Sequence, residues 1–165
     1  MRDVMQGREP REASPSIPSQ LSIDPKRDRI DVQPLLPGKT TGEFPAVDPR
    51  RTGRAYRKLI LATREPGSRA RHAGFDAISR LDLVTGAVDR YTYAPHVIPE
   101  EHVYVPDATR QDEDSGWIVG TSLDFHAAQT RLSIFDARSL ADGPVAVATL
   151  PYVLPLGLHG KFVAA

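Results

Sequence analysis

The sequence contains no cysteine, so disulfides and thiolate metal sites are excluded and the redox compartment is left open. It also has no excess of one charge, because 21 Lys and Arg residues balance 21 Asp and Glu residues. A protein that binds nucleic acid through its phosphates normally carries a basic surplus. A nucleic-acid partner is therefore not expected.

Long apolar runs are lacking as well. The first 20 residues, MRDVMQGREPREASPSIPSQ, spread charges along the segment and contain no apolar core of the kind that a secretory signal needs. No stretch approaches the length of a membrane span. We therefore expect a cytoplasmic location. The prolines and serines of residues 1–20 predict a disordered lead-in, which leaves residues 21–165 as the folded part.

Helical periodicity is missing too, since no segment repeats apolar residues every 3.6 positions. Fifteen prolines among 165 residues argue further against a helical bundle. The chain instead alternates apolar with polar residues and interrupts them with turn residues, which is the pattern of β-hairpins. Three hairpins are predicted, over residues 21–32, 79–93 and 130–150.

Further strands are predicted over residues 56–63, 102–106 and 116–125, which are rich in β-branched and aromatic residues. Pro99 and Pro106 bracket the second of these segments, so we expect that strand to be short. The protein is thus expected to be all-β with long loops.

The hairpins recur at a spacing that suits one architecture. Asp24, Asp82 and Asp136 precede the turns at equivalent places, 58 and 54 residues apart. A hairpin repeated every ~40–55 residues has the length of a four-stranded propeller blade. A β-propeller is one interpretation, and a β-sandwich or barrel whose turns share a composition is the other.

Four of the five histidines have simple explanations. His72, His96 and His126 lie in polar segments or beside turn signals, and they are best interpreted as surface or ordinarily hydrogen-bonded residues. His102 lies in a strand-like run, where alternation allows its side chain to point to either face.

His159 differs because it lies in the apolar terminal segment LPYVLPLGLHGKFVAA. Gly157 and Gly160 let the backbone approach closely, and Pro151 and Pro155 stiffen the approach. A neutral imidazole in a restricted apolar space suits metal ligation, with a partner fixing its other nitrogen. Since no HxH, HxxxH or HxxE pair includes His159, a site built on it must take its other ligands from distant sequence.

Five segments occur in a fixed order and carry a family likeness: GEFPAVDPRRTGRAYR (42–57), EEHVYVP (100–106), EDSGW (113–117), LSIFDARSL (132–140) and VLPLGLHGKF (153–162). Together they resemble the C-terminal part of the carotenoid cleavage oxygenases. That family includes carotenoid and apocarotenoid dioxygenases, lignostilbene dioxygenases and the retinoid isomerase of the visual cycle. The resemblance covers about residues 21–165.

The resemblance implies an all-β fold that is part of a seven-bladed β-propeller, roughly its last two to three blades. It also implies Fe(II) on the propeller axis, held by four histidines, of which the last matches His159. Glu43 and Glu101 match glutamates that accept hydrogen bonds from ligand imidazoles. Without the resemblance, both would be interpreted as salt-bridging carboxylates on exposed loops.

The chain departs from the family pattern at four places. The family usually has a proline after the second glutamate, an aromatic residue before the terminal histidine, a tryptophan shortly after it, and a second aspartate in the acidic motif. The corresponding residues here are His102, Leu158, Phe162 and Ser115. No histidine other than His159 falls at a ligand position of the family.

The function that the resemblance implies is cleavage of conjugated C=C bonds of carotenoids, apocarotenoids or stilbenes with O₂, which gives two carbonyl products. Because three iron ligands would have to come from other polypeptide, we expect this chain alone to be inactive. The expected partners are an apolar polyene or stilbene substrate, O₂ and a complementary N-terminal polypeptide, with peripheral membrane contact open for the intact enzyme. The alternative is a non-catalytic β-propeller remnant or interaction module; a sugar-binding or scaffold propeller is a weaker third.

Overall fold

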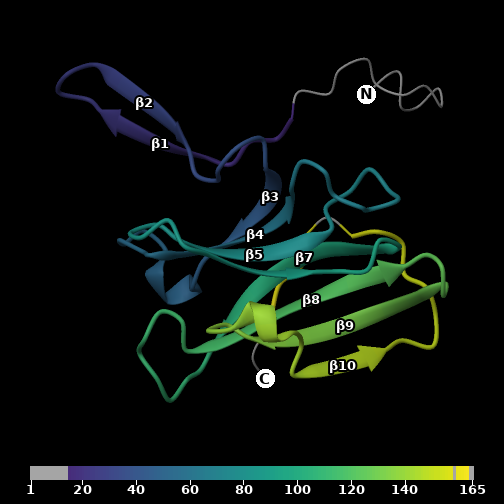
Figure 1. Cartoon of the computed structure of the whole chain (residues 1–165). Helices are drawn as coiled ribbons and strands as arrows, with labels where there is room; N and C mark the ends of the chain where they lie inside the picture. The colour runs from purple at the N-terminus through teal and green to yellow at the C-terminus, as the bar shows by residue number, and fades with distance from the viewer. Residues whose placement is uncertain (1–14, 158, 164–165) are drawn as a thin grey trace.

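The structure, a computed structural model, describes residues 15–157 and 159–163. Within these residues the chain forms three antiparallel sheets, one of two strands and two of four strands (Figure 1). In the described residues, no helix has the length and hydropathy that a membrane span requires.

Each four-stranded sheet is a meander in which strands consecutive in the chain are neighbours. The first sheet contains β3 (Thr41–Ala46), β4 (Lys58–Arg64), β5 (Ala77–Asp82) and β6 (Val88–Thr92). The second contains β7 (Val97–Pro106), β8 (Gly116–Asp124), β9 (Gln129–Asp136) and β10 (Ala146–Thr149). Two short 3₁₀ turns, η2 (Pro49–Arg51) and η3 (Leu140–Asp142), follow β3 and β9. Such meanders are the form of propeller blades.

The main core lies between the two four-stranded sheets. Its buried members, all at most 6% exposed, are Ile60, Ile78, Tyr104, Ile118, Phe135, Ala137 and Leu140. Removal of these side chains from water holds the two sheets face to face. Because side chains alternate along a strand, Leu59 and Leu61 of β4 point to the opposite face, where they form a second cluster with Leu36 and Leu81.

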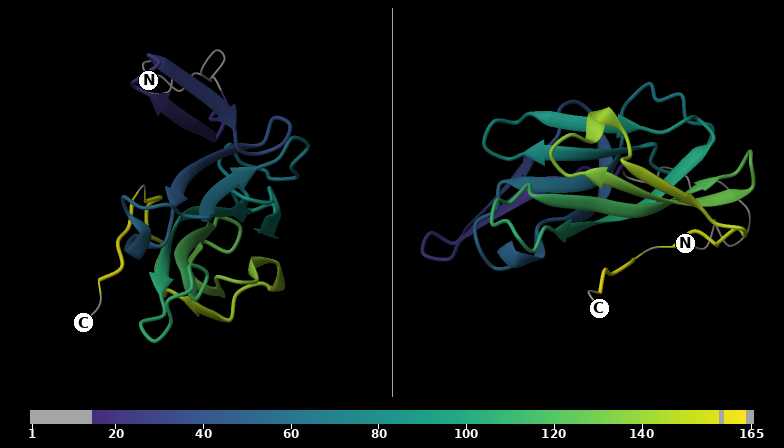
Figure 2. Two further views of the ribbon diagram at one scale, coloured as in Figure 1. Left: turned by 90° about the vertical axis from the view of Figure 1, so that its left-hand side faces the viewer. Right: turned by 90° about the horizontal axis from the view of Figure 1, so that it is seen from below.

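The two-stranded sheet is a hairpin of β1 (Ser19–Asp24) and β2 (Arg29–Pro34), which stands at one end of the stack (Figure 2). Leu21 pairs with Val32, and Ile23 pairs with Ile30. All four side chains are 57–64% exposed. A two-stranded hairpin is at best marginally stable on its own in water, so this element has an apolar face without a cover among the described residues.

A partly buried ion pair links the two stacked sheets at η2. The Asp48 carboxylate is buried, and it accepts hydrogen bonds from Nε and Nη2 of Arg50 at 2.7–3.0 Å. The same guanidinium donates to the carbonyl oxygens of Asp107, Arg110 and Asp112, which follow β7. One side chain thus joins the segment after β3 to the segment after β7.

The three predicted hairpins are confirmed as β1–β2, β5–β6 and β9–β10. The prediction of a short strand between Pro99 and Pro106 is wrong, since β7 runs for ten residues from Val97 to Pro106. A register shift between Pro99 and His102 accommodates the first proline, and β7 is an edge strand, where a missing N–H costs little. Strand β3 was not predicted at all.

The predicted lead-in of residues 1–20 falls mostly on residues 1–14, which lie outside the described residues. Its remaining part contacts the first sheet, because the Gly42 N–H donates to the Ser16 carbonyl at 2.9 Å. The strand β1 begins at Ser19, two residues before the expected boundary.

Candidate functional site

β3 and β7 are the strands with which the two four-stranded sheets begin along the chain. They lie next to each other, and each carries a glutamate at a β-bulge. In β3 the register with β4 shifts between Glu43 and Ala46, and in β7 the register with β8 shifts between Pro99 and His102. A bulge interrupts the ladder and turns a side chain away from its regular direction. Glu43 and Glu101 therefore occupy equivalent places in two consecutive sheets.

The carboxylate of Glu101 contacts two adjacent residues of the terminal segment, His159 and Gly160. Its Oε1 lies 3.4 Å from Nδ1 of His159, and its Oε2 accepts a 2.5 Å hydrogen bond from the Gly160 N–H. The Glu101 side chain is 17% exposed, whereas the His159 side chain is 78% exposed. The imidazole is thus held by a half-buried carboxylate but is not enclosed in the restricted apolar space that the sequence predicted.

A carboxylate at Nδ1 has a chemical consequence for the other ring nitrogen. When Nδ1 carries the proton and donates it to a carboxylate, Nε2 is left with a lone pair for a metal, and its donor strength rises. The Glu101–His159 pair has the donor and acceptor in the places that this arrangement needs.

Phe44 packs against His159 from the neighbouring strand. The two rings meet edge to face with centroids 5.8 Å apart and an interplanar angle of 84°, and Phe75 packs on Phe44 in the same manner at 6.2 Å. Phe44 has a φ of +57°, which a bulky residue rarely adopts. Backbone strain of this kind occurs where the surrounding structure requires a particular side-chain direction, and here the side chain is directed to the His159 ring.

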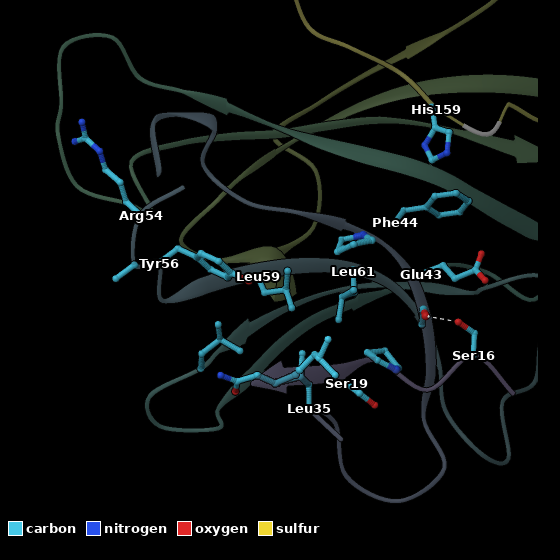
Figure 3. A pocket seen from close by; sticks show the side chains of 17 residues that line it. Ser16, Ser19, Leu35, Glu43, Phe44, Arg54, Tyr56, Leu59, Leu61 and His159 are labelled. Atoms are coloured by element: carbon cyan, nitrogen blue, oxygen red, sulfur yellow. Dashed lines mark hydrogen bonds between the residues drawn. The ribbon is translucent and has the colours of Figure 1, made fainter. Parts of the chain in front are cut away.

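A cavity of about 890 Å³ opens beside these residues, between β1, β3, β4 and the terminal segment (Figure 3). Its walls are mainly apolar and include Leu35, Phe44, Tyr56, Leu59 and Leu61. Glu43 and His159 also line it. Figure 3 shows both near one end of the cavity, on either side of Phe44.

The structure places Glu43 on this cavity but not on a histidine. The residue is exposed, and within the described residues its carboxylate has no hydrogen-bond or ion-pair partner. Of the two predicted glutamates, the structure thus brings only Glu101 to His159.

His102 is a core histidine, although it follows Glu101 directly. It is 2% exposed, its Nδ1 lies 2.9 Å from the Glu100 carbonyl oxygen, and its Nε2 lies 3.0 Å from the Tyr93 hydroxyl. Burial lowers the pKa of this imidazole to about 4. Its ring lies against Gly120 of β8, where an added Cβ would overlap the imidazole, so β8 needs a glycine at this position.

The other three histidines gather around Phe125 rather than around His159. His72 and His96 pack edge to face on the Phe125 ring, and His96 lies 5.4 Å from His126 between ring centroids. Burial lowers the pKa of His72, whose Nε2 lies 3.1 Å from the Val97 carbonyl oxygen. These contacts fit the simple explanations expected from the sequence.

The described residues do not make a complete metal site. Among them, no group of three or more His, Cys, Asp or Glu side chains is arranged to hold a metal ion. They supply one imidazole, His159, together with the carboxylate that contacts its Nδ1. This donor set fits one ligand of a histidine-rich centre.

Sequence reasoning missed one residue of the site, Glu100. Its side chain is only 9% exposed, and its Oε1 accepts a 2.6 Å hydrogen bond from the Gly157 N–H. Its Oε2 accepts a hydrogen bond from the Thr121 hydroxyl. The doubled glutamate of PEEHVYVP was visible in the sequence, but nothing in that pattern indicated that the first carboxylate faces the terminal segment.

The two stacked four-stranded meanders, which do not close into a ring, define the class of the fold: part of a β-propeller. The model of the retinal pigment epithelial membrane protein (RPE65) family matches residues 2–164. The chain belongs to this family, the carotenoid cleavage oxygenases. The resemblance stated from the sequence is thereby confirmed.

Two curated relatives illustrate the similarity. The chain is 28% identical over 148 residues to the apocarotenoid-15,15'-oxygenase of a Synechocystis species, an alignment that covers 88% of this chain and 29% of that protein. It is 33% identical over 130 residues to isozyme III of the lignostilbene-α,β-dioxygenase of Sphingomonas paucimobilis, covering 74% of this chain and 26% of that protein.

A solved structure supports the fold. The cobalt-substituted apocarotenoid oxygenase of Synechocystis matches 92% of this chain with a TM-score of 0.83 and 26% identity, over 31% of its own length. The expected fold class, an all-β part of a propeller, is confirmed. The chain spans between a quarter and a third of the length of these relatives.

Proposed function

We propose that this chain is the C-terminal part of a non-haem Fe(II) dioxygenase that cleaves conjugated C=C bonds of carotenoids, apocarotenoids or stilbenes with O₂. The names of the relatives, an apocarotenoid oxygenase and a lignostilbene dioxygenase, support the substrate class. The observation that carries the proposal for this chain is the contact of Glu101 with both His159 and Gly160.

In this proposal His159 supplies one imidazole ligand through Nε2, and Glu101 keeps the ring in the tautomer that leaves Nε2 free. Ferrous iron held by imidazoles with open positions supplies the activation of O₂. Glu43 contacts a second ligand imidazole, supplied by another polypeptide, in the way that Glu101 contacts His159. Its equivalent place at the bulge of β3 supports that assignment.

The same proposal includes a complementary N-terminal polypeptide that provides the remaining ligands, so that this chain alone is inactive. Two observations support it. The β1–β2 hairpin shares its sequence pattern with β5–β6 and β9–β10, and within the described residues it lacks the two further strands with which each of those hairpins forms a sheet. The cavity lies between β1 and β4 and is lined by Leu21, Leu59 and Leu61, an apolar space of the kind that further strands fill. A cytoplasmic location, with peripheral membrane contact in the intact enzyme, remains the part of the proposal that depends on the sequence alone.

One observation favours the alternative, a non-catalytic remnant or interaction module. The His159 side chain is 78% exposed in this chain, as it would be if it no longer served a metal. The two proposals differ in what happens when the rest of a propeller is supplied.

A chimera tests the choice. Residues 15–163 would replace the matching segment of the Synechocystis apocarotenoid oxygenase, and O₂ uptake and aldehyde formation would be measured with an apocarotenoid. The dioxygenase proposal predicts cleavage that His159→Ala abolishes and that Glu101→Gln lowers about 10- to 100-fold. A folded chimera that is inactive would instead support the remnant.

A further inference from the structure

The terminal segment lies on the surface of the second sheet and is held at three backbone positions. All of its described residues from 151 to 163 are exposed. The Leu154 N–H donates to the Thr130 hydroxyl at 2.9 Å, the Gly157 N–H to Glu100, and the Gly160 N–H to Glu101. Few apolar contacts can fix an exposed segment, so these hydrogen bonds determine where its residues lie.

We propose that Glu100 is a positioning residue for His159: by holding Gly157 it fixes the chain before the histidine, while Glu101 fixes the chain after it. That His159 is a metal ligand rests on the proposed function. The anchoring of the terminal segment by Glu100 is a property of this chain and does not depend on it. It assigns a role to a carboxylate that neither the sequence pattern nor the family motif pointed to.

The environment of Glu100 suits this role. The side chain is 9% exposed, and its two oxygens are divided between the Gly157 N–H and the Thr121 hydroxyl. Hydrogen bonds to an ionised acceptor are shorter and stronger than neutral ones. Because Thr121 lies on β8, the carboxylate is itself held by the sheet, so Gly157 is attached to a rigid element rather than to a mobile side chain.

Two anchors restrict the histidine in a way that one cannot. With Glu101 alone, the segment before His159 could rotate about the hydrogen bond at Gly160. The imidazole would then leave its 3.4 Å contact with Oε1 of Glu101. With Gly157 also fixed, only Leu158 separates the first anchor from the histidine. The ring is then confined between Glu101 and Phe44, which lies 5.8 Å away between centroids.

The competing explanation is that Glu100 only stabilises the β7–β8 pair through Thr121. A suitable control is Glu113, a carboxylate whose Oε1 accepts hydrogen bonds from the backbone N–H groups of Arg57 and Lys58 at 2.5 and 2.7 Å. Unlike Glu100, Glu113 has no hydrogen bond to the described residues of the terminal segment. Glu113→Gln weakens a comparable carboxylate-to-backbone attachment at another place in the same fold.

The experiment compares Glu100→Gln, Glu100→Ala and Glu113→Gln in the full 165-residue chain, without metal or substrate. Amide hydrogen exchange of Gly157 and Gly160 and the ¹⁵N shifts of the His159 imidazole are measured by NMR at one pH, and urea unfolding is measured in parallel. We expect exchange at Gly157 to rise at least 5-fold in Glu100→Gln and further in Glu100→Ala. We also expect the imidazole shifts to move toward those of free histidine.

Glu113→Gln should leave both readouts at their wild-type values. Unchanged Gly157 exchange and imidazole shifts in Glu100→Ala would overturn the proposal, and so would equal changes in Glu113→Gln. If unfolding alone responded in Glu100→Gln, the β7–β8 explanation would stand instead. Because no metal is present, an inactive chimera would refute the proposed function and leave this result intact.

Discussion

Three adjacent polar residues of β7 have different surroundings. Glu100 and Glu101 face the terminal segment, whereas His102 is buried between Tyr93 and Gly120. The bulge between Pro99 and His102 makes this possible, because strict alternation would place Glu100 and His102 on the same face. The burial of His102 has a consequence for how stability depends on pH.

The stability of the chain should fall as the pH is lowered from about 6.5 to about 4. Burial lowers the pKa of His102 to about 4 in the folded chain, against 6.5 for an unperturbed imidazole. The unfolded chain therefore binds this proton more readily, so acid favours unfolding, and the full effect is about 3 kcal/mol. Urea unfolding at several pH values measures it.

The variant His102→Gln serves as the control for this prediction. It should be less stable than the wild type at pH 7.5 and should lose most of the slope between pH 6.5 and 4. A small slope should remain, since burial also lowers the pKa of His72. An equally steep pH dependence in the variant would show that other groups are responsible.

At the scale of elements, the attachment of one sheet to the next depends on η2. Arg50→Met should cost about 2 kcal/mol of unfolding free energy, because it leaves the Asp48 carboxylate, 2% exposed, without its cation and frees three carbonyl oxygens. The measurement is chemical unfolding followed through the fluorescence of Trp117, the only tryptophan, which lies on β8.

Arg29→Met is the matched control, since Arg29 pairs with Asp31 on the exposed hairpin with its side chain 66% exposed. A pair of this kind contributes little, so the control should unfold like the wild type. Equal effects of the two substitutions would mean that the Arg50 contacts do not join the sheets.

The sequence predicted the elements whose residues alternate regularly between recognisable turns. The sequence did not predict β3, because Gly42 and Pro45 disfavour a strand. This strand forms through backbone pairing with β4, which is a tertiary contact. The prediction failed also at Pro99, because the bulge and the edge position that tolerate the proline depend on tertiary structure. For the site, the resemblance indicated Glu43, Glu101 and His159. The contact of Glu100 with Gly157 joins residues that are 57 positions apart in the chain, so no local sequence pattern predicts it.

At the scale of the whole molecule, the open end of the stack should make the isolated chain associate with itself. Leu21, Ile23, Ile30 and Val32 form one exposed apolar face on a two-stranded sheet, and exposed strand edges with apolar faces favour pairing with other chains. The double substitution Ile23→Thr and Ile30→Thr should shift sedimentation profiles toward the monomer. The matched change Ser22→Thr, on the other face, should not; a monomeric wild-type chain would contradict the prediction.

The proposed function depends most on His159 being one ligand of a metal site whose other ligands come from another polypeptide. The direct test is a titration with Fe(II) under anaerobic conditions of the isolated chain, of the chimera with the Synechocystis enzyme, and of that chimera with His159→Ala. We expect one iron per chimera, binding weakened at least 100-fold by the substitution, and no stoichiometric binding by the isolated chain. Stoichiometric iron in the His159→Ala chimera, or in the isolated chain, would contradict this role of His159.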